Sequence, residues 1–105
     1  MNKEQIIGDR ISAMRHWIDS QIAAIKSHNK PITRGSNEWM ELIDTAMEIE
    51  LAALEKFGLV DYFHITKQDN NGETYSESTE AGTHLYYQIE GEVMDKFEVI
   101  DEYRG

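Results

Sequence analysis

Apolar side chains recur every three or four residues along residues 4–27, and this spacing places them on one face of a helix. The face consists of Ile7, Ile11, Met14, Ile18, Ile22 and Ile25. We predict that this helix ends before Pro31, because the residue that precedes a proline avoids the helical conformation. Asn29 is the expected left-handed terminator, and residues 30–37 then form a loop.

A second apolar row predicts a helix over residues 37–57. The row consists of Met40, Ile43, Met47, Leu51 and Leu54, with Trp39, Ala46 and Phe57 beside it. Ser36 or Asn37 can cap the start of this helix. Gly58 can stop it, and Leu59 can then make the apolar contact that closes many helix ends.

A break at Asp44–Thr45 is the alternative for this segment. Thr45 and Glu48 have the spacing of a capping box, which would start a new helix at this point. We favour one continuous helix because the apolar row passes through residues 44–45 without slipping phase.

The following segment predicts a β-hairpin. Residues 59–68 are rich in β-branched and aromatic side chains, with Phe63 and Ile65 expected on one face. Asn71–Gly72 indicates a type I′ turn, since both residues tolerate positive φ angles. The return strand over residues 73–78 is polar and should form an exposed edge.

Thr79 can cap a third long helix. Its apolar row consists of Leu85, Ile89, Val93, Phe97 and Ile100. The order helix, helix, hairpin, helix predicts a mostly helical α+β fold. At 105 residues with 40% apolar side chains, the chain should form a single domain, residues 1–105, around one core.

Charge is distributed unevenly along the chain. The whole sequence has 10 basic and 20 acidic residues, a net charge of −10. Residues 1–35 contain six basic and three acidic residues, a net of +3, so residues 36–105 contain the remaining four basic and 17 acidic residues, a net of −13. Such asymmetry indicates a charged partner rather than a particular fold.

The acidic residues form rows at helical spacing. One row on the second predicted helix consists of Glu41, Asp44, Glu48 and Glu55, and one on the third consists of Glu92, Asp95, Glu98 and Glu102. Like charges at this spacing destabilise a helix by about 0.2–0.5 kcal/mol per pair. Two interpretations remain open: a docking surface for a basic partner, or a solvated face that keeps the protein soluble.

Three short phrases around the hairpin resemble winged-helix regulators of the MarR and PadR type. The phrases are Leu54, Glu55, Gly58, Leu59 and Val60; the turn from Asp69 to Gly72; and Thr79, Glu80, Ala81, Gly82 and Leu85. The resemblance covers about a third of the chain. It implies a recognition helix, a two-stranded wing and a long C-terminal helix that builds a dimer. The first half does not match, because residues 37–57 are barely long enough for a helix-turn-helix. We therefore expect a degenerate or remodelled winged-helix-like fold.

The resemblance also implies DNA binding, but the charge argues against it. The second helix has no arginine, and Lys56 is its only basic residue. Phosphate contacts require lysine and arginine, so this surface should repel DNA. If DNA is bound, the candidate contacts are Lys30, Arg34 and Lys67.

We therefore expect an acidic protein-binding module without a cofactor. It would dock on a basic, nucleic-acid-binding protein and inhibit or regulate it, as DNA-mimicking inhibitors of phages and mobile elements do. The alternatives are a dimeric winged-helix transcriptional regulator and a structural or assembly subunit.

We also expect a homodimer through the first and last helices. The candidate interface consists of Trp17, Ile18, Ile22, Val93, Phe97 and Ile100. Basic residues of the N-terminal part, Arg10, Arg15, Lys26 and Lys30, could pair with acidic helices of the same or the other protomer. Exposed pairs of this kind contribute about 0–1 kcal/mol each, so they would set orientation more than affinity.

Signals for catalysis or metal binding are weak. The chain lacks the glycine patterns and nucleophile motifs of common enzymes, and His16 and His64 do not have the spacing of paired metal ligands. We expect no enzymatic activity and no metal site. The absence of cysteine and of an 18-residue apolar run favours a cytoplasmic protein without a membrane segment.

Overall fold

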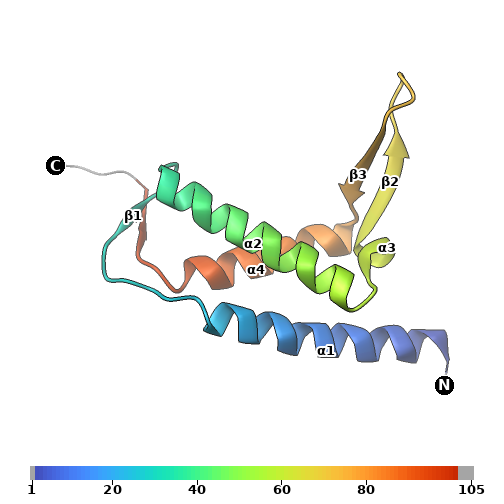
Figure 1. Cartoon of the computed structure of the whole chain (residues 1–105), viewed down its shortest axis with the longest axis horizontal. Helices are drawn as coiled ribbons and strands as arrows, with labels where there is room; N and C mark the ends of the chain where they lie inside the picture. The colour runs from blue at the N-terminus through green and yellow to red at the C-terminus, as the bar shows by residue number, and fades with distance from the viewer. Residues whose placement is uncertain (1, 102–105) are drawn as a thin grey trace.

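The computed structural model describes residues 2–101, which form four helices and two small sheets (Figure 1). The elements are α1 (Lys3–Ala23), β1 (Ile32–Thr33), α2 (Asn37–Lys56), α3 (Val60–Phe63), β2 (His64–Gln68), β3 (Thr74–Ser78), α4 (Glu80–Met94) and β4 (Val99–Ile100). The mostly helical α+β class predicted from the sequence is confirmed.

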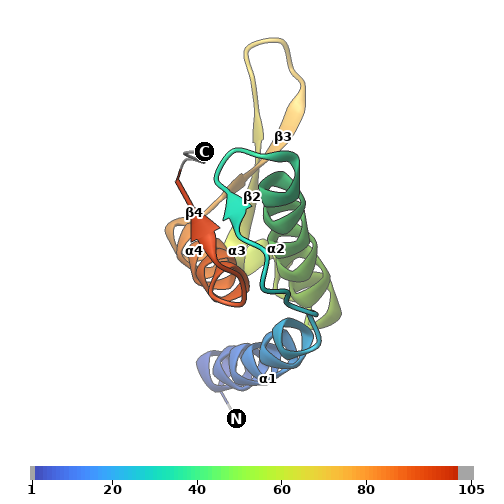
Figure 2. The same cartoon turned by 90° about the vertical axis from the view of Figure 1, so that its left-hand side faces the viewer.

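The helices form two layers. α2 and α4 lie side by side, and α1 packs beneath them (Figures 1 and 2). The hairpin β2–β3 projects from one end of this body on the side away from α1, and the parallel pair β1–β4 closes the other end. The radius of gyration is 16.4 Å, compared with about 13 Å for a compact domain of this length. The molecule is therefore open and thin, with extents of 56 × 40 × 18 Å.

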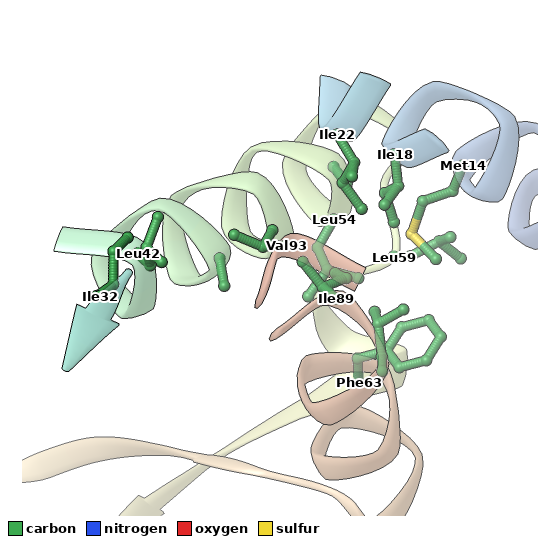
Figure 3. Close-up of a cluster of buried hydrophobic side chains, with 13 residues drawn as sticks. Met14, Ile18, Ile22, Ile32, Leu42, Leu54, Leu59, Phe63, Ile89 and Val93 are labelled. Atoms are coloured by element: carbon green, nitrogen blue, oxygen red, sulfur yellow. The ribbon is translucent and has the colours of Figure 1, made fainter. Parts of the chain in front are cut away.

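One hydrophobic core joins the three long helices (Figure 3). Its buried members are Met14, Ile18, Ile22, Ile32, Leu42, Ala46, Ala53, Leu54, Leu59, Phe63, Leu85, Ile89 and Val93. The predicted apolar face of the first helix is confirmed, because its central residues are buried and Ile7, Ile11 and Ile25 pack against them.

The second helix is continuous, as predicted. The Ser36 hydroxyl caps it by accepting the Trp39 N–H at 3.2 Å. The alternative break is wrong, since the Thr45 hydroxyl donates to the Glu41 carbonyl inside the helix instead of capping a new one.

The predicted stop at Gly58 is also confirmed. Gly58 has a φ of +65°. The Leu59 N–H donates to the Leu54 carbonyl at 2.8 Å and the Gly58 N–H donates to Glu55, which is the Schellman arrangement. Leu59 is buried behind the helix end.

The phase of the apolar row on α2 was predicted wrongly. Met40, Met47 and Leu51 are 47%, 47% and 49% exposed. α2 buries Leu42, Ala46, Glu50, Ala53 and Leu54. Of these, Leu54 belongs to the predicted row and Ala46 was expected beside it, so the prediction is correct at these two positions. The helix turns its small alanines inward because this side packs against both α1 and α4, and the distance between helix axes depends on the size of the side chains at the contact.

Two predicted helix ends are wrong. α1 stops at Ala23, and Asn29 is not left-handed, because no residue other than glycine has a positive φ within residues 2–101. The helix predicted to reach Ile100 stops at Met94. α4 ends early because the segment after it forms β4 and pairs with β1, where the Ile32 N–H donates to the Glu98 carbonyl at 2.8 Å.

The hairpin is confirmed, with two corrections. Residues 60–63 form the short helix α3 instead of the start of the strand. The turn is not type I′, since only Gly72 has a positive φ, +83°. The Asp69 carboxylate accepts the N–H groups of Asn71 and Glu73 at 2.9 Å each and so organises a longer loop. The return strand is fully exposed, as predicted.

The start of α4 is fastened to the end of α3. The Thr79 hydroxyl accepts the Gly82 N–H, which confirms the predicted cap, and it lies 3.1 Å from the Phe63 carbonyl oxygen. A Cβ atom at Gly82 would lie 2.1 Å from the same oxygen. Glycine is thus needed here, and this close approach sets the hairpin against α2 and α4.

Candidate functional site

The exposed side of α2 carries an acidic row. Its members are Glu41, Asp44, Glu48 and Glu55, and all four are exposed. None of them takes part in an ion pair within the described residues 2–101. The structure thus confirms that these residues share an open face, while their role stays a prediction.

An exposed apolar row lies directly beside the acidic one. Met40 and Met47 flank Asp44 at spacings of four and three, and Leu51 lies three residues after Glu48. We call the two rows together the α2 docking face, made of Met40, Glu41, Asp44, Met47, Glu48, Leu51 and Glu55. Apolar side chains beside charged ones match the centre and rim of protein interfaces.

The charge density of this face is lower than that of DNA. Fourteen residues separate Glu41 from Glu55, or about 21 Å at about 1.5 Å per residue. One DNA strand carries about six phosphates over that length, at about 3.4 Å each. Four carboxylates alone are therefore a dilute imitation of a strand, and the apolar row would have to supply part of the contact.

The acidic row predicted on the last helix is not present, because its described members do not lie along one helix. Glu92 lies on α4 and binds Arg15 of α1 at 3.1 Å. Asp95 is the C-terminal cap of α4, and Glu98 lies beyond the helix. Glu102 lies outside the described residues. The prediction failed because it extended the helix past Met94.

Half of the predicted dimer interface is buried inside the chain. Ile18, Ile22 and Val93 belong to the buried core, so they are not available on the surface. Trp17, which makes an edge contact with Phe57, is partly exposed. The remaining two members, Phe97 and Ile100, are partly exposed as well.

The candidate DNA contacts are not brought together. Arg34 binds Asp101 at 2.9 Å and lies over the Trp39 ring, and Lys67 binds Glu77 at 2.7 Å. Arg34 follows β1 and Lys67 lies on β2, at opposite ends of the molecule (Figure 1). Lys30, in the loop before β1, is exposed.

A groove of about 430 Å³ opens between α2, α4 and the base of the hairpin. It is lined by Met47, Glu50, Leu51, His64, Ser78, Thr83, Tyr86 and Tyr87. Sequence reasoning did not single out Glu50, although its spacing of four from both Ala46 and Leu54 places it on the buried side of α2. Glu50 is only 5% exposed.

Hydrogen bonds connect the polar end of the groove. His64 Nε2 lies 3.3 Å from Glu50 Oε1, and His64 Nδ1 lies 3.4 Å from Ser78 Oγ. Both contacts are satisfied if Nε2–H donates to Glu50 and Nδ1 accepts from the Ser78 hydroxyl. The other carboxylate oxygen, Glu50 Oε2, is buried and has no hydrogen-bond partner among the described residues.

Burial shifts the pKa values of two side chains in this groove, Glu50 and Tyr86. Burial raises the pKa of Glu50 above its usual 4.5, while the neighbouring His64 acts in the opposite direction. Burial, reinforced by the negative charges of Glu90 and Glu50, raises the pKa of Tyr86 to about 12. The Tyr86 hydroxyl is thus protonated at neutral pH.

Ser78, His64 and Glu50 follow the order of a nucleophile, a base and a carboxylate. Acyl transfer also requires N–H donors aimed at the reacting oxygen. The nearby backbone donors are occupied: the Thr79 N–H binds the Phe63 carbonyl at 2.9 Å and the Gly82 N–H binds the Thr79 hydroxyl. The geometry thus supports a polar wall for a ligand better than a catalytic centre.

No protein-family model, no curated protein and no solved structure matches this chain. The resemblance to winged-helix regulators therefore stays a prediction. Among residues 2–101 there is no group of three or more His, Asp or Glu side chains that could hold a metal ion. No helix in this part of the chain has the length and apolar character needed to cross a membrane.

Proposed function

We propose that this chain is a protein-binding module whose α2 docking face binds the basic, nucleic-acid-binding surface of another protein and inhibits or regulates it. The observation that carries the proposal is the acidic row beside exposed Met40, Met47 and Leu51. Other acidic residues, such as Glu92 and Glu77, are paired within the chain. The row on α2 has no such partner in the described structure, so its charge is available to another molecule.

A basic partner fits this face better than a second copy of the chain. Two copies that met through α2 would bring two acidic rows together, and like charges across an interface are unfavourable. A partner with lysine and arginine around an apolar patch would match both rows. The site would act in the cytoplasm, where nucleic-acid-binding proteins are accessible.

Capture from a lysate of the native host tests the proposal. The wild-type chain is compared with a triple variant, Glu41→Lys, Asp44→Lys and Glu48→Lys. Each exposed charge contact contributes about 0.2–1 kcal/mol, so losing three lowers affinity by about three- to 150-fold, and reversal lowers it further. The captured protein is identified by mass spectrometry and then purified for binding measurements.

The control reverses three acidic residues elsewhere, Asp9→Lys, Asp61→Lys and Glu73→Lys, which are exposed and outside the α2 docking face. Both variants change the net charge from −10 to −4, because each reversal adds two charges. The partner should bind the control variant and should not bind the triple variant. The wild-type chain should displace nucleic acid from the partner. Equal binding of the first variant and the wild type would show that the α2 row is not the docking site.

The homodimer expected from the sequence is a separate proposal, restricted to the partly exposed Trp17, Phe97 and Ile100. Static light scattering decides it. A mass near twice 12.2 kDa supports a dimer, and a mass of 12.2 kDa refutes it.

A further inference from the structure

The groove between α2, α4 and the hairpin has the construction of a small-molecule site. Its volume of about 430 Å³ falls within the range of about 300–1,000 Å³ that is common for such sites. Apolar and aromatic side chains form most of its wall, and the polar groups Glu50, His64 and Ser78 converge at one end. Such a combination both holds a ligand and orients it.

Glu50 indicates the chemistry of that ligand. Its carboxylate is almost fully buried, and His64 occupies only Oε1. Oε2 has no donor among the described residues. Buried polar atoms normally have a partner, and a buried carboxylate is best satisfied by a charged donor. None of the described residues that line the groove is a lysine or an arginine.

The walls around Glu50 restrict the ligand further. The Glu50 carboxylate would repel an anion and attract a cation. The rings of Tyr86 and Tyr87 can face a cation or stack on a flat group. Met47 and Leu51 offer an apolar surface next to them.

We propose that this groove binds a small organic cation, namely a primary or secondary ammonium group on a flat apolar body. The ammonium group pairs with the Glu50 carboxylate at the inner end of the groove, and the body packs against Leu51 and Tyr87. The proposal does not rest on the protein-binding function. Met47 and Leu51 nevertheless belong to both the groove and the α2 docking face.

Three probes with the same body separate charge from shape. They are 2-phenylethylamine, which is a cation at pH 7, neutral 2-phenylethanol and anionic phenylacetate. Binding is followed on the full chain by two-dimensional amide NMR. A ligand of this size should bind with roughly millimolar affinity. The amine should bind at least tenfold more tightly than the alcohol, phenylacetate should not bind, and the shifted amides should include those of Glu50, His64 and Tyr87.

Variants of the chain test the assigned groups. Glu50→Gln should weaken amine binding at least tenfold and remove the preference over the alcohol. Glu48→Gln is the matched control, because it removes the same charge from an exposed position on the same helix outside the groove. It should change amine affinity by less than about twofold.

Tyr87→Ala keeps the test decisive if Glu50→Gln does not fold. Tyr87 is 62% exposed, so its removal should leave the fold intact. Amine affinity should then fall by about two- to 30-fold through the lost cation–ring contact. Equal affinity of wild-type protein for amine and alcohol, no amine binding at about ten millimolar, or equal losses in Glu48→Gln and Glu50→Gln would each overturn the proposal.

Discussion

Gly82→Ala should destabilise the protein, whereas Gly91→Ala in the same helix should not. A Cβ at Gly82 would lie 2.1 Å from the Phe63 carbonyl oxygen and 3.1 Å from the carbonyl carbon. The Thr79 N–H donates to that oxygen at 2.9 Å, so the atoms that would have to move belong to the backbone at the start of α4. A Cβ at Gly91 meets nothing within 4 Å.

The magnitude follows from the displacement that is required. Ordinary van der Waals contact with a Cβ begins at 3.4 Å, so the oxygen must retreat by 1.3 Å, the difference between 3.4 and 2.1 Å. Overpacking costs about 1–3 kcal/mol, and disturbing the Thr79 cap costs about 1 kcal/mol more. Alanine regains up to about 1 kcal/mol of helix propensity at either position. We expect Gly82→Ala to lose about 1–3 kcal/mol and Gly91→Ala to gain up to about 1 kcal/mol.

Urea denaturation followed by far-UV circular dichroism measures both variants against the wild type. Thermal unfolding provides a second readout, with about 4–8 °C expected per kcal/mol for a domain near this size. If Gly82→Ala proves as stable as Gly91→Ala, the close approach of α4 to α3 is not a feature of the folded protein. The placement of the hairpin beside α2 would then have to be revised.

Three further predictions concern α2 and its end. Leu54→Ala should lower the free energy of unfolding by about 2–5 kcal/mol, while Leu51→Ala should change it by less than about 0.5 kcal/mol; equal losses in urea denaturation would refute the observed phase of α2. The raised pKa of Glu50 means that the folded chain binds a proton more tightly than the unfolded chain, so this group makes stability fall as pH rises from about 4.5 through the raised value. Glu50→Gln removes that contribution, so the free energy of unfolding of the variant should rise relative to that of the wild type as pH rises. If the difference between the two proteins stays constant with pH, the raised pKa of Glu50 is contradicted. Gly58→Ala should cost about 1–2 kcal/mol because it forces alanine to a φ of +65°, and unchanged stability in the same assay would refute the left-handed stop.

Helix caps and stops were predictable because they depend on a few neighbouring residues. The cap at Ser36, the cap at Thr79 and the stop at Gly58 each involve hydrogen bonds over five positions or fewer. The helix end that was predicted wrongly at α4 depends on contacts between residues far apart in the sequence. α4 stops at Met94 because β1 pairs with the segment that follows, where Ile32 meets Val99, 67 residues later in the chain. No local pattern contains that information.

The groove shows the same division. Glu50, His64 and Ser78 are separated by 14 residues at each step, and their contacts exist only because the base of the hairpin lies beside α2. The spacing of Glu50 could have indicated a buried position, but not its partner. The identity of that partner depends on the close approach at Gly82.

The sequence alone determined that Glu41, Asp44, Glu48 and Glu55 share one face of a helix, because helical periodicity is a local property. The tertiary structure decided the rest. Packing of α2 against both α1 and α4 buried the alanine side and left Met40, Met47 and Leu51 exposed beside the acidic row. Long-range strand pairing ended α4 early, so the second predicted acidic row does not lie on one helix. The burial and pairing of a residue depend on what folds against it.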